Sequence, residues 1–362
     1  MKTEILPCVN AEKKRGEEIR RVLKELKLLR TDAKITSNDN FIYLPLIRAL
    51  NEDEIGEIGV EELLTREFEV LEQRKNIEDL VGFKPSYEII GDIAVLTDAD
   101  SINEKNEQLV AHAIMNLHKN INVVAKRLSP VEGAFRKRKM KIIAGENRTE
   151  TMHRENGCRY KLDLEKVYFN PRLASERNRV ALQVGRSEKG EIIDMFAGVG
   201  SFSVQIAKRA RQSHVTAIDF NPAAIRYLCE NINLNDVRNV EAIEGDVREI
   251  YVNFRNRADR IIMNLPKSAY LFLKEALSML NPRGGIIHFY DVESSYSDVS
   301  GEKRKTVGTA ITKAKEKLIA KIEETCEQEG FPFHSLEIRE ARKVKPYAPY
   351  AYIIGINAMV KK

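Results

Sequence analysis

A glycine-containing turn between an expected strand and an expected helix limits the chemistry of this sequence most strongly. Residues 192–203 read IIDMFAGVGSFS, where a short apolar run ends in Asp194 and Gly198 and Gly200 follow. This order predicts the strand, tight turn and helix that open a nucleotide-binding α/β fold, with glycines where the backbone approaches a ligand. Ser203 stands where a dinucleotide-binding loop has its third glycine, and no Gly-Lys-Ser/Thr follows. We therefore expect neither a nicotinamide site nor a Walker-type phosphate site.

Carboxylates follow the next two expected strands. Asp219 ends the apolar run 215–218, at a position where an acid can bind a pair of ribose hydroxyls. Asp246 follows the run 240–243 and could accept a hydrogen bond from an adenine amino group. Carboxylates disfavour a pyrophosphate and suit a cationic ligand. S-adenosylmethionine, which carries a sulfonium and an ammonium, fits them, and the pattern from about residue 180 onward resembles class I S-adenosylmethionine-dependent methyltransferases.

Two further segments could act on a substrate. Residues 264–266 read NLP after the apolar run 260–263, and Asn-x-Pro there would present an amide and a rigid carbonyl to a planar base, although Asn and Pro also favour ordinary turns. Arg172 and Glu176 are four residues apart on an expected helix, so they share one face. That spacing usually marks a surface ion pair. At a cofactor cleft the carboxylate could instead remove a ring proton while the guanidinium stabilises the adjacent oxygen.

A basic segment lies upstream, at residues 126–148. Charge runs are often solvated surfaces, but such a cluster beside a cofactor domain more often follows the phosphates of a nucleic acid. The net charge of the chain is only +5, which favours local contacts over a uniformly basic surface.

Composition limits the class of protein. A chain of 362 residues has room for two or three domains, and its 43% hydrophobic and 31% charged residues describe a soluble globular protein. No run of eighteen apolar residues predicts a membrane span, and the N-terminus lacks the apolar core of a signal peptide. The four cysteines are scattered without a C-x-x-C pair. They favour a reducing cytoplasm over a zinc site or a disulfide framework, and no cofactor metal is expected.

The fold class expected is α/β, in three parts. Residues 1–72 form a small N-terminal α/β domain, residues 73–165 a basic α/β RNA-binding domain, and residues 166–362 a Rossmann-like methyltransferase domain. The last domain should end in an antiparallel pair of strands, at 336–341 and 350–360, that closes its sheet.

Together these segments resemble the archaeal and eukaryotic class I tRNA (guanine(37)-N1)-methyltransferases. The resemblance spans nearly the whole chain and is carried by KITSNDNFIYLPL, GENRTETMHRENG, KVYFNPRLASER, DMFAGVGSFS, NLP and the C-terminal YAP. Two positions depart from the family pattern. Asn170 stands where serine is usual, and Tyr350 follows YAP where glycine is commoner. Neither residue has a predicted chemical role.

The resemblance implies methyl transfer from S-adenosylmethionine to N1 of guanosine 37. N1 carries a proton whose removal moves charge onto O6, so a base and a cationic group suit the reaction. The implied catalytic residues are Glu176 as general base, Arg136 at the guanine oxygen and Asn264 against the base. The implied substrate-binding residues are Tyr168, which could stack on a base, with Arg172, Pro266, Arg138 and Arg148. The implied cofactor-binding residues are Asp194, Phe196, Gly198, Gly200, Asp219, Asp246, Val247 and Asn264.

The expected partner is tRNA, contacted at its anticodon stem-loop and, through the N-terminal unit, at its outer corner. A cytoplasmic monomer is expected. Two alternatives stay open. One is a wyosine-pathway relative that modifies a tricyclic guanosine at position 37 by methyl or aminocarboxypropyl transfer, and the other is a non-catalytic tRNA-binding protein. The intact NLP and Glu176 favour N1 methylation.

Overall fold

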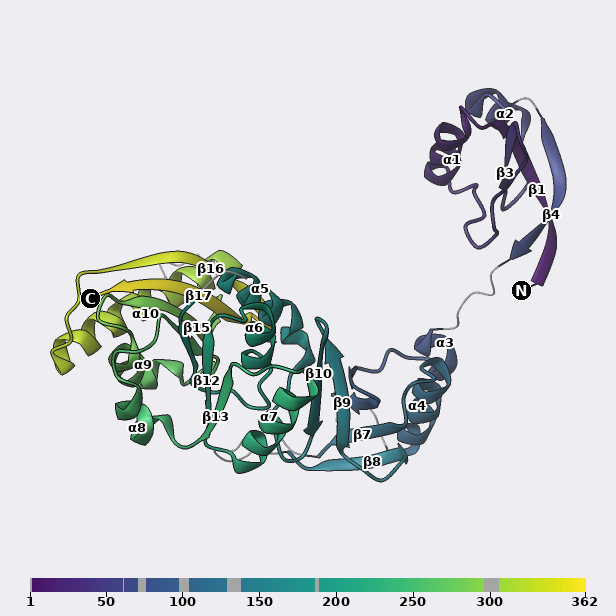
Figure 1. Cartoon of the computed structure of the whole chain (residues 1–362). Coiled ribbons are helices and arrows are strands. Elements are labelled where there is room, and N and C mark those ends of the chain that lie inside the picture. Colours follow the sequence, from purple (N-terminus) through teal and green to yellow (C-terminus); the bar gives the residue numbers. More distant parts are fainter. Residues whose placement is uncertain are drawn as a thin grey trace, which may run out of the picture. The chain divides into compact units, whose positions relative to one another are not determined.

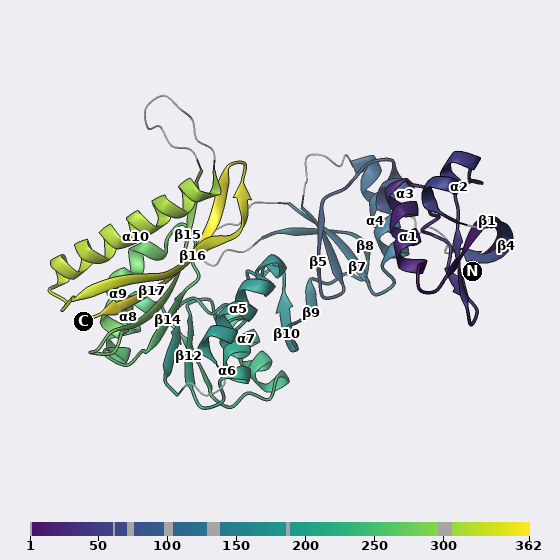
Figure 2. The same ribbon diagram turned by 90° about the horizontal axis from the view of Figure 1, so that it is seen from above.

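The computed structural model describes residues 2–60, 62–70, 76–97, 104–128, 138–185, 189–295 and 306–362, without the side chains of residues 104 and 105. The chain divides into two compact units, Met1–Leu80 and Val81–Lys362. Figures 1 and 2 show both units, which we describe separately. Arg136, the predicted partner of the guanine oxygen, lies outside the described residues. No helix in the described ranges is long and apolar enough to cross a membrane.

The N-terminal unit is a small antiparallel sheet covered by helices. Its strands lie in the order β2 (Thr36–Ser37), β3 (Phe41–Pro45), β1 (Lys2–Glu12), β4 (Leu63–Val70). Helix α1 (Gly16–Glu25) buries Ile19 and Leu23 in the core of this unit. Helix α2 (Glu52–Ile58) begins with a capping box, because Asn51 and Glu54 each accept a hydrogen bond from the other's backbone N–H. The unit ends within helix α3 (Ile77–Val81).

The second unit begins with a four-stranded sheet and a hairpin. The sheet order is β5 (Tyr87–Ile90), β6 (Ile93–Leu96), β7 (Val123–Arg127), β8 (Met140–Gly145), and helix α4 (Glu104–Leu117) connects the parallel strands β6 and β7. The hairpin β9 (Glu150–Glu155) and β10 (Cys158–Asp163) packs closely on the β5–β6 turn. A Cβ at Gly91 in that turn would lie 2.1 Å from Thr151 Oγ1, so only glycine permits this approach.

A seven-stranded sheet forms the rest of the second unit. Its order is β13 (Val240–Glu244), β12 (His214–Asp219), β11 (Glu191–Asp194), β14 (Arg260–Met263), β15 (Gly285–Ser294), β17 (Ala351–Lys361), β16 (Ser335–Ala348). The first five strands are parallel, and β17 pairs antiparallel with both β15 and β16. The predicted α/β class and its closing antiparallel pair are confirmed; β16 is longer than the expected 336–341, and β17 has the expected length but begins and ends one residue later.

Helices cover both faces of this sheet, as Figure 2 shows. Because side chains alternate along a strand, Ile192 and Ile262 pack with α5 (Ala174–Val184), α6 (Ser203–Arg209) and α7 (Pro222–Leu234). Their neighbours Ile193 and Ile261 pack with α9 (Leu273–Met279) and α10 (Val307–Glu329) on the opposite face. Shorter elements are η1 (Pro171–Leu173), α8 (Val247–Ile250), η2 (Tyr251–Phe254) and η3 (Ala269–Phe272). Strands that are buried on both faces explain the continuous apolar runs in the sequence.

Candidate active site

The carboxyl ends of four adjacent parallel strands bring together most of the predicted cofactor residues. Asp219, Asp194 and Met263 end β12, β11 and β14, and Asn264 follows β14 directly. Asp246 lies two residues beyond β13. In an open parallel sheet this edge is where ligands bind. The side chain of Asn264 is half-buried and makes no hydrogen bond with the described part of the chain, so its amide is available to a ligand.

The two glycines of the turn have different tasks. Both have positive φ, +56° at Gly198 and +83° at Gly200. A Cβ at Gly200 would lie 2.3 Å from Leu228 Cδ1, so this glycine lets α7 pack against the turn. A Cβ at Gly198 would meet nothing closer than Tyr168 O at 3.9 Å, so the turn is open there. The Gly198 N–H donates a 2.7 Å hydrogen bond to Asp219 Oδ2, which fixes that carboxylate beside the opening.

Asp194 is fully buried and incompletely satisfied. Ser203 Oγ donates a 2.7 Å hydrogen bond to Oδ2, while Oδ1 has no hydrogen-bond partner within the described ranges. Burial raises the pKa of Asp194 to about 7. A buried carboxylate with a vacant acceptor favours a cationic ligand group. Ser203, which the sequence showed only as a missing glycine, is therefore a positioning partner of this acid.

The side chains of the remaining predicted cofactor residues already have partners within the protein. Asp246 caps α8 by accepting from Arg248 N at 3.0 Å, and its carboxylate also pairs with the Arg248 guanidinium, which lowers the pKa of Asp246. An adenine amino group would have to share this acceptor with Arg248. The side chain of Val247 is buried in the core. Phe196 packs edge-on against Phe272 with ring centroids 5.0 Å apart.

Glu176 lies at the centre of a buried cluster of hydrogen-bond donors. Its carboxylate accepts from Tyr290 Oη at 2.6 Å and from Arg179 Nη2 and Nε at 2.8 and 3.1 Å, and it also pairs with Arg342. Burial alone would raise the pKa of Glu176, but the hydrogen bonds and charges of Arg179 and Arg342 outweigh it and hold the pKa at about 2. Glu176 is therefore ionised and fully paired in this structure.

A glycine in the sheet allows this cluster to form. Tyr290 on β15 and Arg342 on β16 are both opposite Gly355 on the strand between them, β17. A Cβ at Gly355 would lie 3.2 Å from Tyr290 Cε1 and 3.5 Å from Arg342 Nη2. The missing side chain thus lets both groups converge on Glu176. The Tyr290 ring also packs against Phe202, which follows the glycine turn, with centroids 5.9 Å apart.

Arg172 and Glu176 do not pair with each other. Arg172 lies in η1, before α5 begins, and its Nε is 2.7 Å from Glu88 Oε1 on β5. Asn170 caps η1 by accepting from Arg172 N at 3.1 Å, as a residue before Pro171 can. The alternative interpretation of these two residues as a surface ion pair is therefore wrong.

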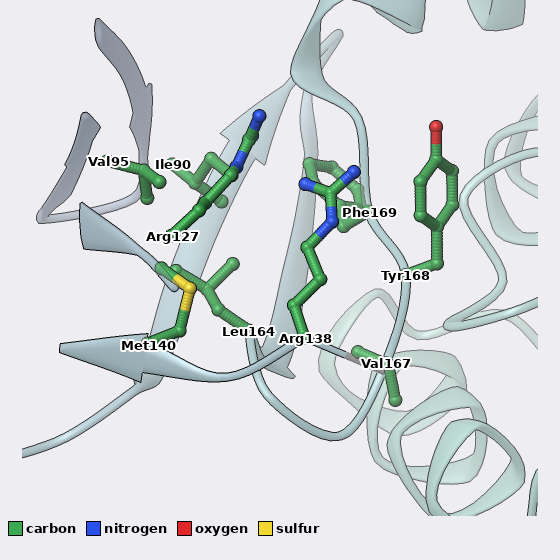
Figure 3. A pocket seen from close by; sticks show the side chains of 9 residues that line it. All are labelled: Ile90, Val95, Arg127, Arg138, Met140, Leu164, Val167, Tyr168 and Phe169. Carbon is green, nitrogen blue, oxygen red and sulfur yellow. The ribbon is translucent and has the colours of Figure 1, made fainter. Parts of the chain in front are cut away.

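Figure 3 shows the surroundings of Tyr168, the predicted base-stacking residue. The guanidinium of Arg138 lies 5.8 Å from the Tyr168 ring centre, and both side chains line one pocket with Arg127. Arg148 is engaged elsewhere: it pairs with Asp92 and Glu146 and holds the β9 hairpin to the β5–β6 turn. Pro266 is partly exposed, and the next residue, Lys267, has its Nζ 4.8 Å from the centre of the Tyr347 ring.

Comparisons with known proteins match this architecture along nearly the whole chain. The model of the TRM5/TYW2 methyltransferase domain matches residues 151–319. The models of the TYW2 N-terminal domain and the tRNA methyltransferase 5 N-terminal domain match residues 68–149 and 8–54. The tRNA (guanine(37)-N(1))-methyltransferase Trm5b of Pyrococcus abyssi is 40% identical over 349 residues, 96% of this chain and 97% of that protein. This chain belongs to the TRM5/TYW2 methyltransferase family.

Two further relatives are similar over less of the chain. A tRNA(Phe) (4-demethylwyosine(37)-C(7)) aminocarboxypropyltransferase of Methanocaldococcus jannaschii is 32% identical over 76% of this chain and 98% of its own. The tRNA 4-demethylwyosine(37)-methyltransferase Taw21 of Saccharolobus solfataricus is 38% identical over 61% of this chain and 83% of its own.

Two solved Trm5 structures align with nearly the whole chain. The crystal structure of Trm5b from Pyrococcus abyssi has a TM-score of 0.72 at 37% identity and covers 99% of this chain and 100% of its own. The complex of aTrm5 with tRNALeu has a TM-score of 0.66 at 34% identity and covers 98% of this chain and 99% of its own.

Proposed function

We propose that this chain transfers the methyl group of S-adenosylmethionine to N1 of guanosine 37 in tRNA. The observation that carries the proposal is the match to Trm5b along nearly the full length of both chains, together with the match of the tRNA methyltransferase 5 N-terminal domain to residues 8–54. The wyosine-pathway relatives span only 76% and 61% of this chain. Its function is therefore that of the relatives that share all of its parts.

The cofactor fits the residues at the strand ends. S-adenosylmethionine supplies an electrophilic methyl group on its sulfonium. Asp194, with its unpaired buried oxygen, would bind the ammonium of the methionine part, and Asp219 would bind the ribose hydroxyls. Gly198 leaves space for the ligand beside the turn. These assignments have direct tests in cofactor binding.

Glu176 as the general base requires a change of partners. A carboxylate whose pKa is about 2 is a weak proton acceptor at neutral pH, and all its neighbours donate to it. It can accept the N1 proton only when the guanine N1–H replaces one of those donors. The half-buried amide of Asn264, which has no partner in the described ranges, would then orient the base.

Recognition of the tRNA would use both units of the chain. The Val81–Lys362 unit, which carries the site, would bind the anticodon stem-loop, and the N-terminal unit would contact the outer corner. We infer that the protein acts as a monomer in the cytoplasm, where its substrate is found.

Nucleoside mass spectrometry tests this function. Unmodified tRNA transcripts with G37 or A37 are incubated with the protein and S-adenosylmethionine. 1-Methylguanosine formed only in the G37 transcript would establish the reaction, the atom and the position. No product on G37, together with modification of a tRNA that carries 4-demethylwyosine, would instead assign the chain to the wyosine pathway.

A further inference from the structure

Glu88 lies between two guanidinium groups in the second unit. Its Oε2 is 2.6 Å from Arg127 Nη2, and its Oε1 is 2.7 Å from Arg172 Nε. The Glu88 side chain is only 11% exposed, whereas that of Arg172 is 56% exposed. One carboxylate thus holds two cations that a ligand can approach from the solvent.

A third cation, Lys345, interacts electrostatically with Glu88 and with both arginines, and it has no ion-pair partner among the described residues. It lies on β16, which packs against η1, and η1 in turn packs against β5. Lys345 is half-buried and makes no ion pair or hydrogen bond with the described residues. Burial lowers its pKa, as do the like charges of Arg172 and Arg127, against the opposing effect of Tyr168 and Glu88. Three cations therefore share one carboxylate, an unfavourable excess of positive charge that an anion would relieve.

The adjoining pocket has the lining that a nucleotide requires. Figure 3 shows the guanidinium groups of Arg127 and Arg138 and the hydroxyl of Tyr168 pointing to one side of an apolar floor. That floor is formed by Ile90, Met140, Leu164 and Phe169, among others. Guanidinium groups bind phosphate in a bidentate manner, and aromatic rings stack on bases. Arg127 lines this pocket and also pairs with Glu88, so the cations around Glu88 adjoin the pocket.

We propose that Arg127, Arg172 and Lys345 together bind one backbone phosphate of the tRNA beside the target guanosine, and that Glu88 occupies the position of that phosphate in the free protein. The inference rests on the proposed function, because it takes tRNA as the ligand. Exchange of the Glu88 carboxylate for a phosphate preserves the charge-assisted hydrogen bonds of both arginines and gives Lys345 its missing partner. Glu88 also competes with incidental anions, which adds specificity at some cost in affinity.

The salt dependence of tRNA binding tests Lys345. The dissociation constant of a tRNA transcript is measured over a range of salt concentrations for the wild type and for Lys345→Ala. Loss of one phosphate contact should lower the slope of log K against log salt by about 0.7–0.9 and weaken binding. Lys343→Ala is the matched control, because Lys343 lies on the same strand and its Nζ is 5.6 Å from the centre of the Tyr352 ring, outside the cluster. Its slope should not change.

Glu88→Gln should change the tRNA affinity and the salt slope in the direction opposite to Lys345→Ala. Removal of the competing carboxylate should tighten tRNA binding at low salt and steepen the slope. A purely structural role for Glu88 would instead weaken binding at an unchanged slope. Equal slopes for Lys345→Ala and Lys343→Ala would overturn the phosphate site even if the wild type methylates G37. A lowered slope for Lys345→Ala with no methylation of any transcript would retain the site and reject the proposed function.

Discussion

Replacement of Glu176 by glutamine should destabilise this protein as well as stop methyl transfer. The carboxylate is 5% exposed and satisfies Tyr290, Arg179 and Arg342 at once. A pKa of about 2 in place of the ordinary 4.5 corresponds to about 3 kcal/mol in favour of the charged form, at about 1.4 kcal/mol per pKa unit. Because a neutral glutamine forfeits this term, Glu176→Gln should lose about 3 kcal/mol of unfolding free energy at pH 7.

Thermal unfolding followed by circular dichroism measures this loss. For a large domain, about 3 kcal/mol corresponds to a midpoint lower by roughly 6–12 °C. Glu340→Gln is the matched control, because Glu340 contacts the same Arg179 and Arg342 at 2.9 and 2.8 Å but is 36% exposed. A partly exposed ion pair contributes less, so this variant should lose about 1 kcal/mol or less and keep its turnover.

The pH dependence of the stability difference between the wild type and Glu176→Gln shows whether the ionised Glu176 carboxylate causes it. Glu176 has a lowered pKa in the folded protein, so its stabilisation is complete above the unfolded pKa of 4.5 and is lost as the pH falls towards about 2. The gap between wild type and Glu176→Gln should stay constant from pH 8 to about pH 5 and narrow below that. Equal stabilities of Glu176→Gln and Glu340→Gln at pH 7 would refute the buried cluster. Normal methyl transfer by folded Glu176→Gln would remove Glu176 from the mechanism.

Three further changes test other parts of the site. Asp194→Asn should weaken S-adenosylmethionine binding. The affinity of the wild type should rise as the pH increases through about 7, because Asp194 must lose its proton to attract the ammonium. Calorimetry at pH 6 and pH 8 measures both effects, and a wild-type affinity that does not change with pH would contradict the assignment. Glu155→Gln should cost about 3–5 kcal/mol in urea unfolding, because Arg177, 2% exposed and 2.5 Å from Glu155, would lose its buried partner; a cost below 1 kcal/mol would mean that water reaches the pair. Tyr290→Phe should keep the ring packing against Phe202 but lose the 2.6 Å bond to Glu176, at about 2 kcal/mol in the same assay, and an unchanged stability would show that this bond contributes nothing net.

Local patterns in the sequence were sufficient to predict the class of fold and the edge of the sheet at which the predicted cofactor residues meet. Apolar runs that end in Asp194, Asp219 and Met263 became adjacent parallel strands, because parallel strands buried on both faces need such runs and right-handed crossovers align their carboxyl ends. The turn at Gly198 and Gly200 was equally predictable from the sequence, because positive φ values and a close helix approach require glycine at fixed positions.

The electrostatic state of the site was decided by tertiary structure alone. Arg179 lies three residues from Glu176 and could have been noticed, but Tyr290 and Arg342 lie 114 and 166 residues away and reach it across Gly355. In the same way Arg172, in η1, pairs with Glu88 on β5, which belongs to the four-stranded sheet and lies more than eighty residues earlier in the sequence. Sequence spacing determines which residues share a strand end or a helix face. Burial and the charges brought close by packing determine pKa and partners, and these depend on distances that no local pattern contains.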